Sequence, residues 1–209
     1  MKNLQKIRVL VAMTALSVLV LVVANIVSVK LWDFAGIAVD GGIVIFPLSY
    51  ILGDLMMEIY GKKMANYVVF LSFGMDVLVT LIILVVGCLP AYPGWGGQAA
   101  YEAILGFTPR IMLGSLVAYL VSELMNNVVF EKIKRVTGEG KLWLRLLGSS
   151  AVARVADTVI FETVAFFGVL SAGEFILQAG FAYVAGFALE IILTPVTYWL
   201  VGKLKKYAI

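Results

Sequence analysis

Residues 46–63 read FPLSYILGDLMMEIYGKK, an apolar stretch that carries two acids four residues apart, Asp54 and Glu58. Side chains at i and i+4 lie on the same face of an α-helix, so both carboxylates face one way, in line with Tyr50 and Lys62. Such a helix needs an apolar solvent around it and a polar environment along one stripe. The composition of the whole chain indicates which solvent that is.

The chain is far more apolar than a protein built for water. Its 209 residues are 62% hydrophobic and only 14% charged, with a mean hydropathy of +1.03. Soluble domains are about half apolar and about a quarter charged. The composition therefore predicts an integral membrane protein. The first apolar run lacks a small-residue cleavage motif, so we expect a retained span and no cleaved signal peptide.

Apolar runs long enough to cross about 30 Å of hydrocarbon predict an all-α bundle of six transmembrane helices. Residues 1–209 form a single transmembrane domain in this interpretation. The spans are expected at about 8–29, 43–60, 64–88, 109–131, 146–170 and 175–201. The second span is the shortest, because its polar end at Asp54 and Glu58 uses up apolar length.

Lysine and arginine collect on one side of this map. They lie at the amino terminus, after the second span, after the fourth span and in the tail, whereas loops 31–42, 89–108 and 171–174 hold none. Positive residues near short loops stay in the cytoplasm, so both termini are expected there. The net charge of +3 is then a topology signal and does not indicate a nucleic-acid partner.

The scarcity of reactive side chains excludes several functions. Cys88 is the single cysteine and histidine is absent, so one chain can build neither a disulfide nor a cysteine-based metal site, and histidine chemistry is excluded. Nothing resembles a phosphate-binding loop. We expect no catalytic residue, no metal and no cofactor.

Ionisable residues nevertheless lie inside or at the edge of the spans. They are Asp54, Glu58, Asp76, Arg110, Glu123, Arg154, Asp157, Glu162 and Glu190. A charge at the bilayer centre costs about 3 kcal/mol on insertion scales, so each needs a partner or a wet cavity. Structural pairing, such as Arg154 with Asp157 or Glu58 with Lys62, is one interpretation, and we prefer it for Asp76 and Glu162. For Asp54, Glu58, Arg154 and Asp157 we favour a functional cavity, because aromatic residues accompany them.

The fourth and fifth spans share a short pattern. SELMNNVVF at 122–130 aligns without gaps on ARVADTVIF at 153–161, which sets Glu123 opposite Arg154, Asn126 opposite Asp157, and Phe130 opposite Phe161. Internal repeats with a binding site between them are a recurring transporter plan. Chance similarity over nine residues is the alternative, and both interpretations stay open.

Several blocks resemble the queuosine precursor transporters of the vitamin uptake transporter superfamily. These blocks are Asn25 and Lys30, GGIVIFPLSYILGDLMMEIYGKKMA (41–65), FTPRIMLGSLVAYLVSE (107–123), and LWLRLLGSS followed by DTVIF (142–161). The second block is the most specific, and the resemblance covers nearly the whole chain. Three positions depart from the family pattern: Asn66 replaces the usual Arg, Asn126 the usual Asp, and Ala153-Arg154 the usual Ser-Gln. These departures bear on the identity of the ligand and leave the transporter class unchanged.

The resemblance implies uptake of a 7-deazaguanine into the cytoplasm across the inner (plasma) membrane, as the nitrile or aminomethyl precursor of queuosine or as queuine. A carboxylate can accept the adjacent N–H donors of a guanine edge, an arginine can donate to its carbonyl, and stacking on aromatic rings contributes about 1–3 kcal/mol per base. The expected substrate-binding residues are Asn25, Phe46, Tyr50, Asp54, Glu58, Arg110, Tyr119, Glu123, Asn126, Phe130, Arg154, Asp157 and Phe161. The expected partners are this small molecule and the lipid bilayer, and a homodimer is an open prediction.

Other functions fit the residues less well. A vitamin-binding S-component of an energy-coupling-factor transporter usually has small residues four apart on its first helix, but Ala12 is followed by Leu16. An intramembrane aspartyl protease would need a second motif to match Gly53-Asp54, and the context of Asp157 does not provide one. The energy source stays open between proton coupling through a carboxylate and passive facilitation.

Overall fold

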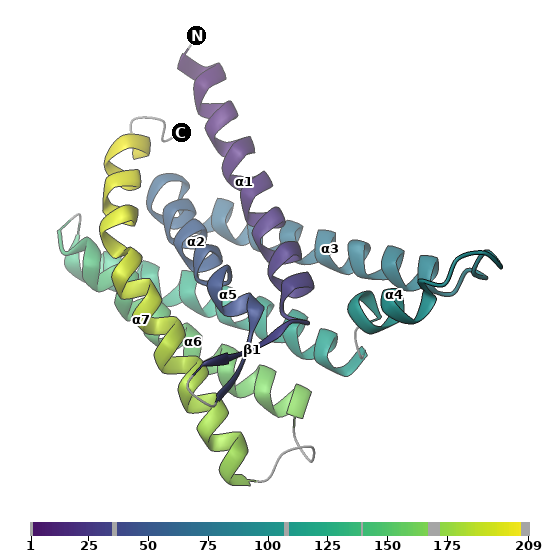
Figure 1. The fold of residues 1–209 in the computed structure, drawn as a ribbon. Coiled ribbons are helices and arrows are strands. Elements are labelled where there is room, and N and C mark those ends of the chain that lie inside the picture. Colours follow the sequence, from purple (N-terminus) through teal and green to yellow (C-terminus); the bar gives the residue numbers. More distant parts are fainter. Residues whose placement is uncertain (1, 35–36, 107–108, 139, 167–171, 206–209) are drawn as a thin grey trace.

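The computed structural model describes residues 2–34, 37–106, 109–138, 140–166 and 172–205. In chain order the elements are α1 (Lys2–Val27), β1 (Leu31–Phe34), β2 (Ile37–Asp40), the 3-10 turn η1 (Gly41–Val44), α2 (Pro47–Tyr60), α3 (Lys62–Gly87), α4 (Gln98–Leu105), α5 (Pro109–Thr137), α6 (Leu142–Phe166) and α7 (Ala172–Leu204) (Figure 1). The predicted all-α membrane bundle is confirmed.

A helix lies at each of the six predicted spans. Five stretches are long and apolar enough to cross a membrane: Leu4–Val27, Gly41–Tyr60, Lys62–Gly87, Leu113–Thr137 and Phe175–Leu204. Helix α6 is also long enough, but Arg145, Arg154, Asp157 and Glu162 make it more charged than an ordinary span. The six-span topology and the cytoplasmic termini stay predictions.

The stretch FPLSYILGDLMMEIYGKK forms most of a tight helical hairpin. Pro47 is the first residue of α2, where its missing N–H removes no helical hydrogen bond. Gly61 ends the helix with φ of +77°, in the left-handed region that favours glycine, and its N–H donates to the carbonyls of Met56 and Met57 at 3.1 Å. Because α3 starts at Lys62, the two helices are joined by this one glycine.

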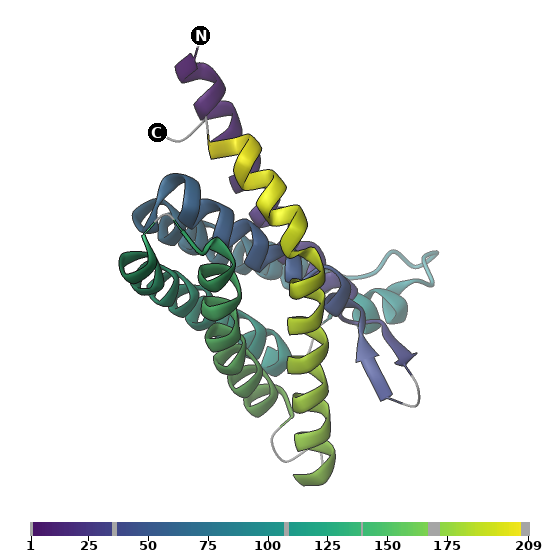
Figure 2. The ribbon, with the colours of Figure 1, turned by 90° about the vertical axis from the view of Figure 1, so that its left-hand side faces the viewer.

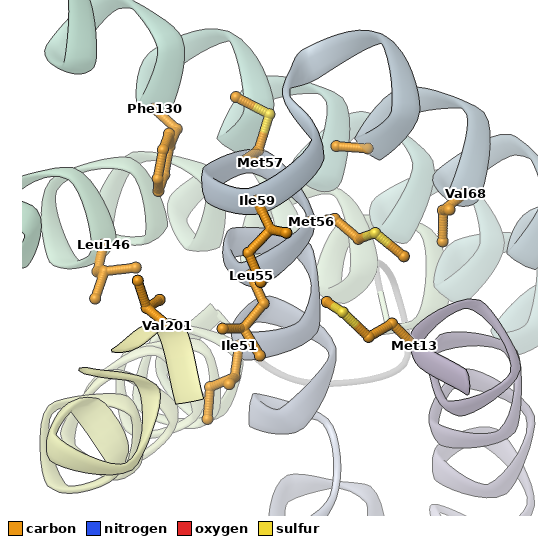
Figure 3. Packing of buried hydrophobic residues seen from close by; sticks show 11 residues of the cluster. Met13, Ile51, Leu55, Met56, Met57, Ile59, Val68, Phe130, Leu146 and Val201 are labelled. Atoms are coloured by element: carbon orange, nitrogen blue, oxygen red, sulfur yellow. The ribbon is translucent and has the colours of Figure 1, made fainter. Parts of the chain in front are cut away.

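Helix α2 lies inside the bundle, with α1, α3, α5 and α7 around it (Figures 1 and 2). Its apolar residues form a cluster with side chains from the other helices (Figure 3). The members that α2 contributes are Ile51, Leu55, Met56, Met57 and Ile59, and they pack with Met13 of α1, Phe130 of α5, Leu146 of α6 and Val201 of α7. The shortest predicted span is therefore the packing centre of the fold.

The outer helix faces are apolar. Tyr67, Phe70 and Leu81 on α3, and Ile176 and Ile192 on α7, are all more than half exposed. In water such a surface would drive aggregation, whereas in a bilayer it faces lipid tails. A protein with exposed apolar faces around a partly polar interior is suited to a lipid bilayer.

Two elements were not expected from the sequence. Residues 31–42 hold an antiparallel hairpin, which pairs Leu31 with Asp40, and Phe34 lies 5.8 Å from Phe181 of α7 between ring centroids. Residues 98–105 form α4, whose Tyr101 hydroxyl donates to the Ile83 carbonyl of α3 at 3.1 Å. Both segments are too short for a clear sequence period.

Candidate functional site

The interior of the bundle is unusually polar for a membrane protein. Buried ionisable and amide side chains come from α2, α3, α5, α6 and α7: Asp54, Glu58, Asp76, Glu123, Asn126, Asn127, Arg145, Arg154, Glu162 and Glu190. Ionisable residues at this depth mark functional sites by default, because each is costly unless it has a partner. The contacts divide them into a central group, a group at the chain-terminal end and a smaller network on α1, α3 and α5.

The central group is organised around Tyr50 and Arg154. Tyr50 of α2 is completely buried, and the guanidinium carbon of Arg154 lies 4.6 Å from its ring centroid. Arg154 Nη2 forms an ion pair with Glu190 Oε2 of α7 at 3.1 Å. Gly186 of α7 leaves room for this guanidinium, because a side chain there would collide with it. The group thus joins three helices far apart in sequence.

The alternative interpretation, a structural ion pair of Arg154 with Asp157, is not what the structure shows. Arg154 binds Glu190 of another helix, and Asp157 accepts a hydrogen bond from Ser122 Oγ of α5 at 3.3 Å. Asp157 and Arg154 still act on each other electrostatically. Because helix spacing reports only neighbours on one helix, Glu190 could not be identified as the partner from the sequence.

Asp54 lies beside this group and is held by an amide. Asn126 Nδ2 of α5 donates to Asp54 Oδ1 at 2.9 Å, and both side chains are at least 98% buried. The Asn126 carbonyl oxygen has no hydrogen-bond partner. The Asp54 carboxylate and the Asn126 carbonyl oxygen, which still lacks a hydrogen-bond donor, therefore lie next to each other in the bundle interior.

Glu123 lies one helical turn before Asn126 and borders a small enclosed cavity. Ser49, Gly53 and Tyr119 are among the residues that share this lining, and the cavity measures about 10 Å³. That is room for one water molecule. Tyr119 is buried beside it, as predicted for an aromatic residue of the interior.

The chain-terminal end of the bundle carries a second polar group, centred on Glu58. Its carboxylate forms three ion pairs. The partners are Lys134 Nζ of α5 at 3.0 Å, Arg145 Nη2 of α6 at 3.1 Å, and Lys205 Nζ, just after α7, at 3.2 Å. Lys62, the partner suggested by sequence spacing, binds Glu131 of α5 instead, at 2.8 Å. The Glu58–Lys62 pair of the alternative interpretation is therefore replaced by other ion pairs.

Asn25 belongs to the network outside the central group. Its Nδ2 donates to Asp76 Oδ2 of α3 at 2.7 Å, and its Oδ1 accepts from Ser115 Oγ of α5 at 2.7 Å. Asp76 thus has the structural partner that we preferred for it. The network ties α1, α3 and α5 together.

The remaining predicted residues are spread over the bundle. Phe46 lies edge-on to Tyr50, with ring centroids 6.0 Å apart and an interplanar angle of 70°. Phe130 is fully buried in the apolar cluster, and the Arg145 guanidinium lies 5.9 Å from its centroid. Phe161 is half-buried on α6. Arg110 is in the first turn of α5, and its side chain lies outside the described residues.

Sequence reasoning missed several members of the site. Arg145 was counted among the loop charges, although its side chain is only 1% exposed. Glu190 was noted as an intramembrane acid but not placed in the site. Asn127 donates to Asn66 Oδ1 of α3 at 2.9 Å. The one sequence signal for Glu190 was its charge inside an apolar run.

Comparisons with known proteins place the chain in a family. Residues 40–200 match the family described as "Putative vitamin uptake transporter". A "Probable queuosine precursor transporter" of Bacillus subtilis (strain 168) is 34% identical over 85% of this chain and 78% of its own length. A "Probable queuosine precursor transporter" of Haemophilus influenzae (strain ATCC 51907 / DSM 11121 / KW20 / Rd) is 25% identical over 60% of this chain and 51% of its own length. A "Queuosine precursor transporter" of Escherichia coli (strain K12) is 25% identical over 58% of this chain and 52% of its own length.

No solved structure matches the chain. The family model nevertheless spans all the helices from α2 to most of α7, which are those that build the polar interior. The chain belongs to the vitamin uptake transporter family, and it is a multi-pass transporter of the inner (plasma) membrane, not an enzyme.

Proposed function

We propose that this transporter imports a 7-deazaguanine precursor of queuosine into the cytoplasm, as the nitrile or aminomethyl form or as the free base queuine. The names of the matched relatives support the substrate class. The chemistry of the central group supports it independently.

One observation carries the proposal: buried acceptors in the central group outnumber the donors that could satisfy them. In the described part of the chain, the acceptors without a hydrogen-bond partner in and beside this group are the Asn126 carbonyl oxygen, Glu190 Oε1 and both Glu123 oxygens. The donors without one are Arg154 Nε and the Tyr50 and Ser150 hydroxyls. Unmet buried groups of this kind cost about 1–3 kcal/mol each. A guanine-like edge offers adjacent N–H and NH2 donors and one carbonyl acceptor, so it complements this set.

The proposed ligand contacts follow from this complementarity. Asp54 and Asn126 accept the edge donors, and Arg154 donates to the ring carbonyl. Tyr50 and Phe46 supply aromatic surface for stacking, worth about 1–3 kcal/mol per base. Asp157, held by Ser122, lies at the margin of the same group.

Other predicted residues take supporting roles in this proposal. Asn25, Tyr119, Phe130 and Phe161 hold helices around the site, and the role of Arg110 stays a prediction. The Glu58 carboxylate is saturated by three cations, which favours a structural pairing over ligand contact.

Ligand binding requires the helices to move. The cavity beside Glu123 measures about 10 Å³, which suits one water molecule and is far too small for a fused bicyclic ring. The described helices are therefore in a closed arrangement around Tyr50. We infer that substrate enters when one part of the bundle rocks against the other, as in alternating access.

We also infer that α6 is the sixth span and that the termini are cytoplasmic. The Arg145, Arg154 and Glu162 side chains are buried inside the bundle and away from lipid, as the charged side chains of transmembrane helices usually are. The basic residues around Glu58 lie at the ends of α5 and α7 and at the start of α6, which fits a cytoplasmic face.

A salvage assay tests the function. The chain is expressed in a strain that cannot make the precursor, and tRNA is assayed for queuosine at nanomolar external precursor. We expect modification to be restored by this chain alone. If the protein reaches the membrane and no queuosine appears, the substrate assignment is wrong. Failure that is rescued by an added ATP-driven module would indicate a vitamin-binding S-component instead.

A further inference from the structure

One buried acid has no polar partner in the closed bundle. Glu123 is 2% exposed, and neither of its carboxylate oxygens has a hydrogen-bond partner. The Ser49 hydroxyl lies close to it but donates to the Phe46 carbonyl at 2.8 Å. Among the buried carboxylates that the structure describes, Glu123 is the one with both oxygens unbonded.

The carboxylate faces a chamber that can hold one water molecule. The cavity of about 10 Å³ lies between α1, α2, α3 and α5, and Ser17, Ser49 and Tyr119 give it polar walls. A Cβ at Gly53 would lie 2.8 Å from Glu123 Oε2, so any other residue here would force the carboxylate to shift. The α2 backbone thus approaches the acid closely enough to leave space only for the carboxyl and a water.

The charges around Glu123 do not balance. Its titratable neighbours are Asp54 and Tyr50 on α2, Tyr119 on α5, Arg154 and Asp157 on α6, and Glu190 on α7. From α1 and α3 the described lining is uncharged: Ser17, Ala65, Val68 and Val69. Four carboxylates against one guanidinium leave an excess of three negative charges if all are ionised. A water-poor interior disfavours that excess, because each desolvated ion costs several kcal/mol, and protonation of one acid lowers the excess to two.

Each of the other three acids has a hydrogen-bond donor. Arg154 Nη2 binds Glu190 at 3.1 Å, Asn126 binds Asp54 at 2.9 Å, and Ser122 binds Asp157 at 3.3 Å. Glu123 receives none, so its neutral, protonated form fits the closed bundle best.

We propose that Glu123 is the proton-binding site of the transporter and that one proton enters the cell with each substrate molecule. This inference rests on the proposed import function and supplies its energy source. When the site opens outward, hydronium transfers a proton to the Glu123 carboxylate, which forms a neutral carboxyl and water. When the site opens to the cytoplasm, a water molecule accepts that proton and the carboxylate re-forms.

The empty carrier then needs a counter-ion for the ionised acid. Arg154 interacts electrostatically with Glu123, and its Nε is a buried donor without a partner. A guanidinium has five N–H donors, so Arg154 can bind Glu123 on the return step without releasing Glu190. Net transfer with an uncharged substrate is one positive charge per cycle.

The test uses the full chain in liposomes with the labelled nitrile form of the 7-deazaguanine. Exchange of labelled for unlabelled substrate without a gradient measures transport itself. An inside-alkaline pH gradient in sodium-free buffer measures coupling, and a trapped dye reports interior acidification. With one proton per substrate, each pH unit supports about tenfold accumulation.

The wild-type protein should accumulate substrate under the gradient and acidify the interior. Glu123→Gln replaces a neutral carboxyl by a neutral amide, so the ratio of gradient-driven accumulation to gradient-free exchange should fall to the value without a gradient, and the acidification should be lost. Glu123→Asp, which keeps a carboxyl, should recover part of the gradient response. Glu102→Gln, at an exposed acid of α4, is the matched control and should behave like the wild type.

Gradient-driven accumulation by Glu123→Gln would overturn the proposal. So would a wild-type protein that exchanges substrate but does not accumulate it under the pH gradient, or that requires sodium. If the wild type exchanges no 7-deazaguanine, the proposed import function fails, and the proton site is judged separately. The wild-type infrared spectrum at neutral pH should then show a protonated-carboxyl C=O band that Glu123→Gln lacks. Identical carboxyl bands in the two proteins would refute the site.

Discussion

Glu58 and Glu123 are two buried acids in one bundle with opposite surroundings. Glu58, at the end of α2, is contacted by three cations from three other segments, whereas neither carboxylate oxygen of Glu123, within α5, has a hydrogen-bond partner among the described residues. Near a basic membrane face, lysine and arginine can reach inward and neutralise an acid. Deeper in the bundle, cations are few, and an acid there remains available for a proton or a ligand. On this difference we base our proposal that Glu58 stabilises the fold and that Glu123 binds the transported proton.

The largest effect is expected when the Glu58 group is broken. Glu58→Gln removes the anion that Arg145 and two lysines share, and removing one partner of a buried ion pair costs about 3–5 kcal/mol. Glu123→Gln removes no such pair and should leave stability nearly unchanged. Thermal unfolding in detergent measures both variants. Equal losses of stability would contradict the division between the two acids.

The next effect concerns the ligand contacts of the central group. Asp54→Asn and Asp157→Asn replace acceptors by amides, which should cost about 1–3 kcal/mol of substrate binding, or about 5–150-fold. Uptake at nanomolar precursor should then be lost although the proteins still insert in the membrane. Asp33→Asn, in the exposed hairpin, is the matched control. Normal uptake by both central variants would refute the cavity assignment.

A smaller effect is expected at the glycine that makes room for Glu123. Gly53→Ala should gain about 1 kcal/mol of helix propensity, but its methyl group would press on the carboxylate. These two effects oppose each other, so we expect no net rise in the unfolding temperature. We also expect gradient-driven uptake to fall. Gly74→Ala on α3, where a methyl group meets no atom within 4 Å, is the control and should keep full uptake. Similar behaviour of the two variants would show that the chamber does not matter.

The smallest effect is expected at a partly exposed ion pair near the Glu58 group. Glu131 binds Lys62 at 2.8 Å and Arg135 at 3.0 Å, and its side chain is 31% exposed. Exposed pairs contribute little because water and salt screen them. Glu131→Gln should therefore leave the unfolding temperature unchanged within error, and a drop as large as that of Glu58→Gln would show that the whole polar end acts as one network.

Much of the helical fold could be predicted from the sequence. Helices lie at all six expected ranges, and the end of α2 at the YGKK motif follows from the glycine at position 61. The hairpin at 31–40 and helix α4 were missed, because four to eight residues hold too few repeats of a hydrophobic period to be recognised.

Several residues of the polar interior were predictable from the sequence, but their pairing was not. Tyr50, Asp54, Asn126 and Arg154 were singled out as charged, amide or aromatic residues in apolar runs, and the structure brings them into the same interior. Both pairings suggested by helix spacing, Glu58 with Lys62 and Arg154 with Asp157, were replaced by contacts between helices. A short-range spacing rule cannot report which helices become neighbours.

The sequence by itself determined the solvent of this protein, its helices and the presence of acids that lipid cannot accommodate, because hydropathy and helical period are local properties of the chain. Only the tertiary structure decided which acids are neutralised. Glu58 meets cations because the ends of α5, α6 and α7 converge on α2. Among the described residues Glu123 forms no ion pair, because the guanidinium near it, that of Arg154, binds Glu190. Charge balance depends on distances between helices, and those distances exist only after the bundle has packed.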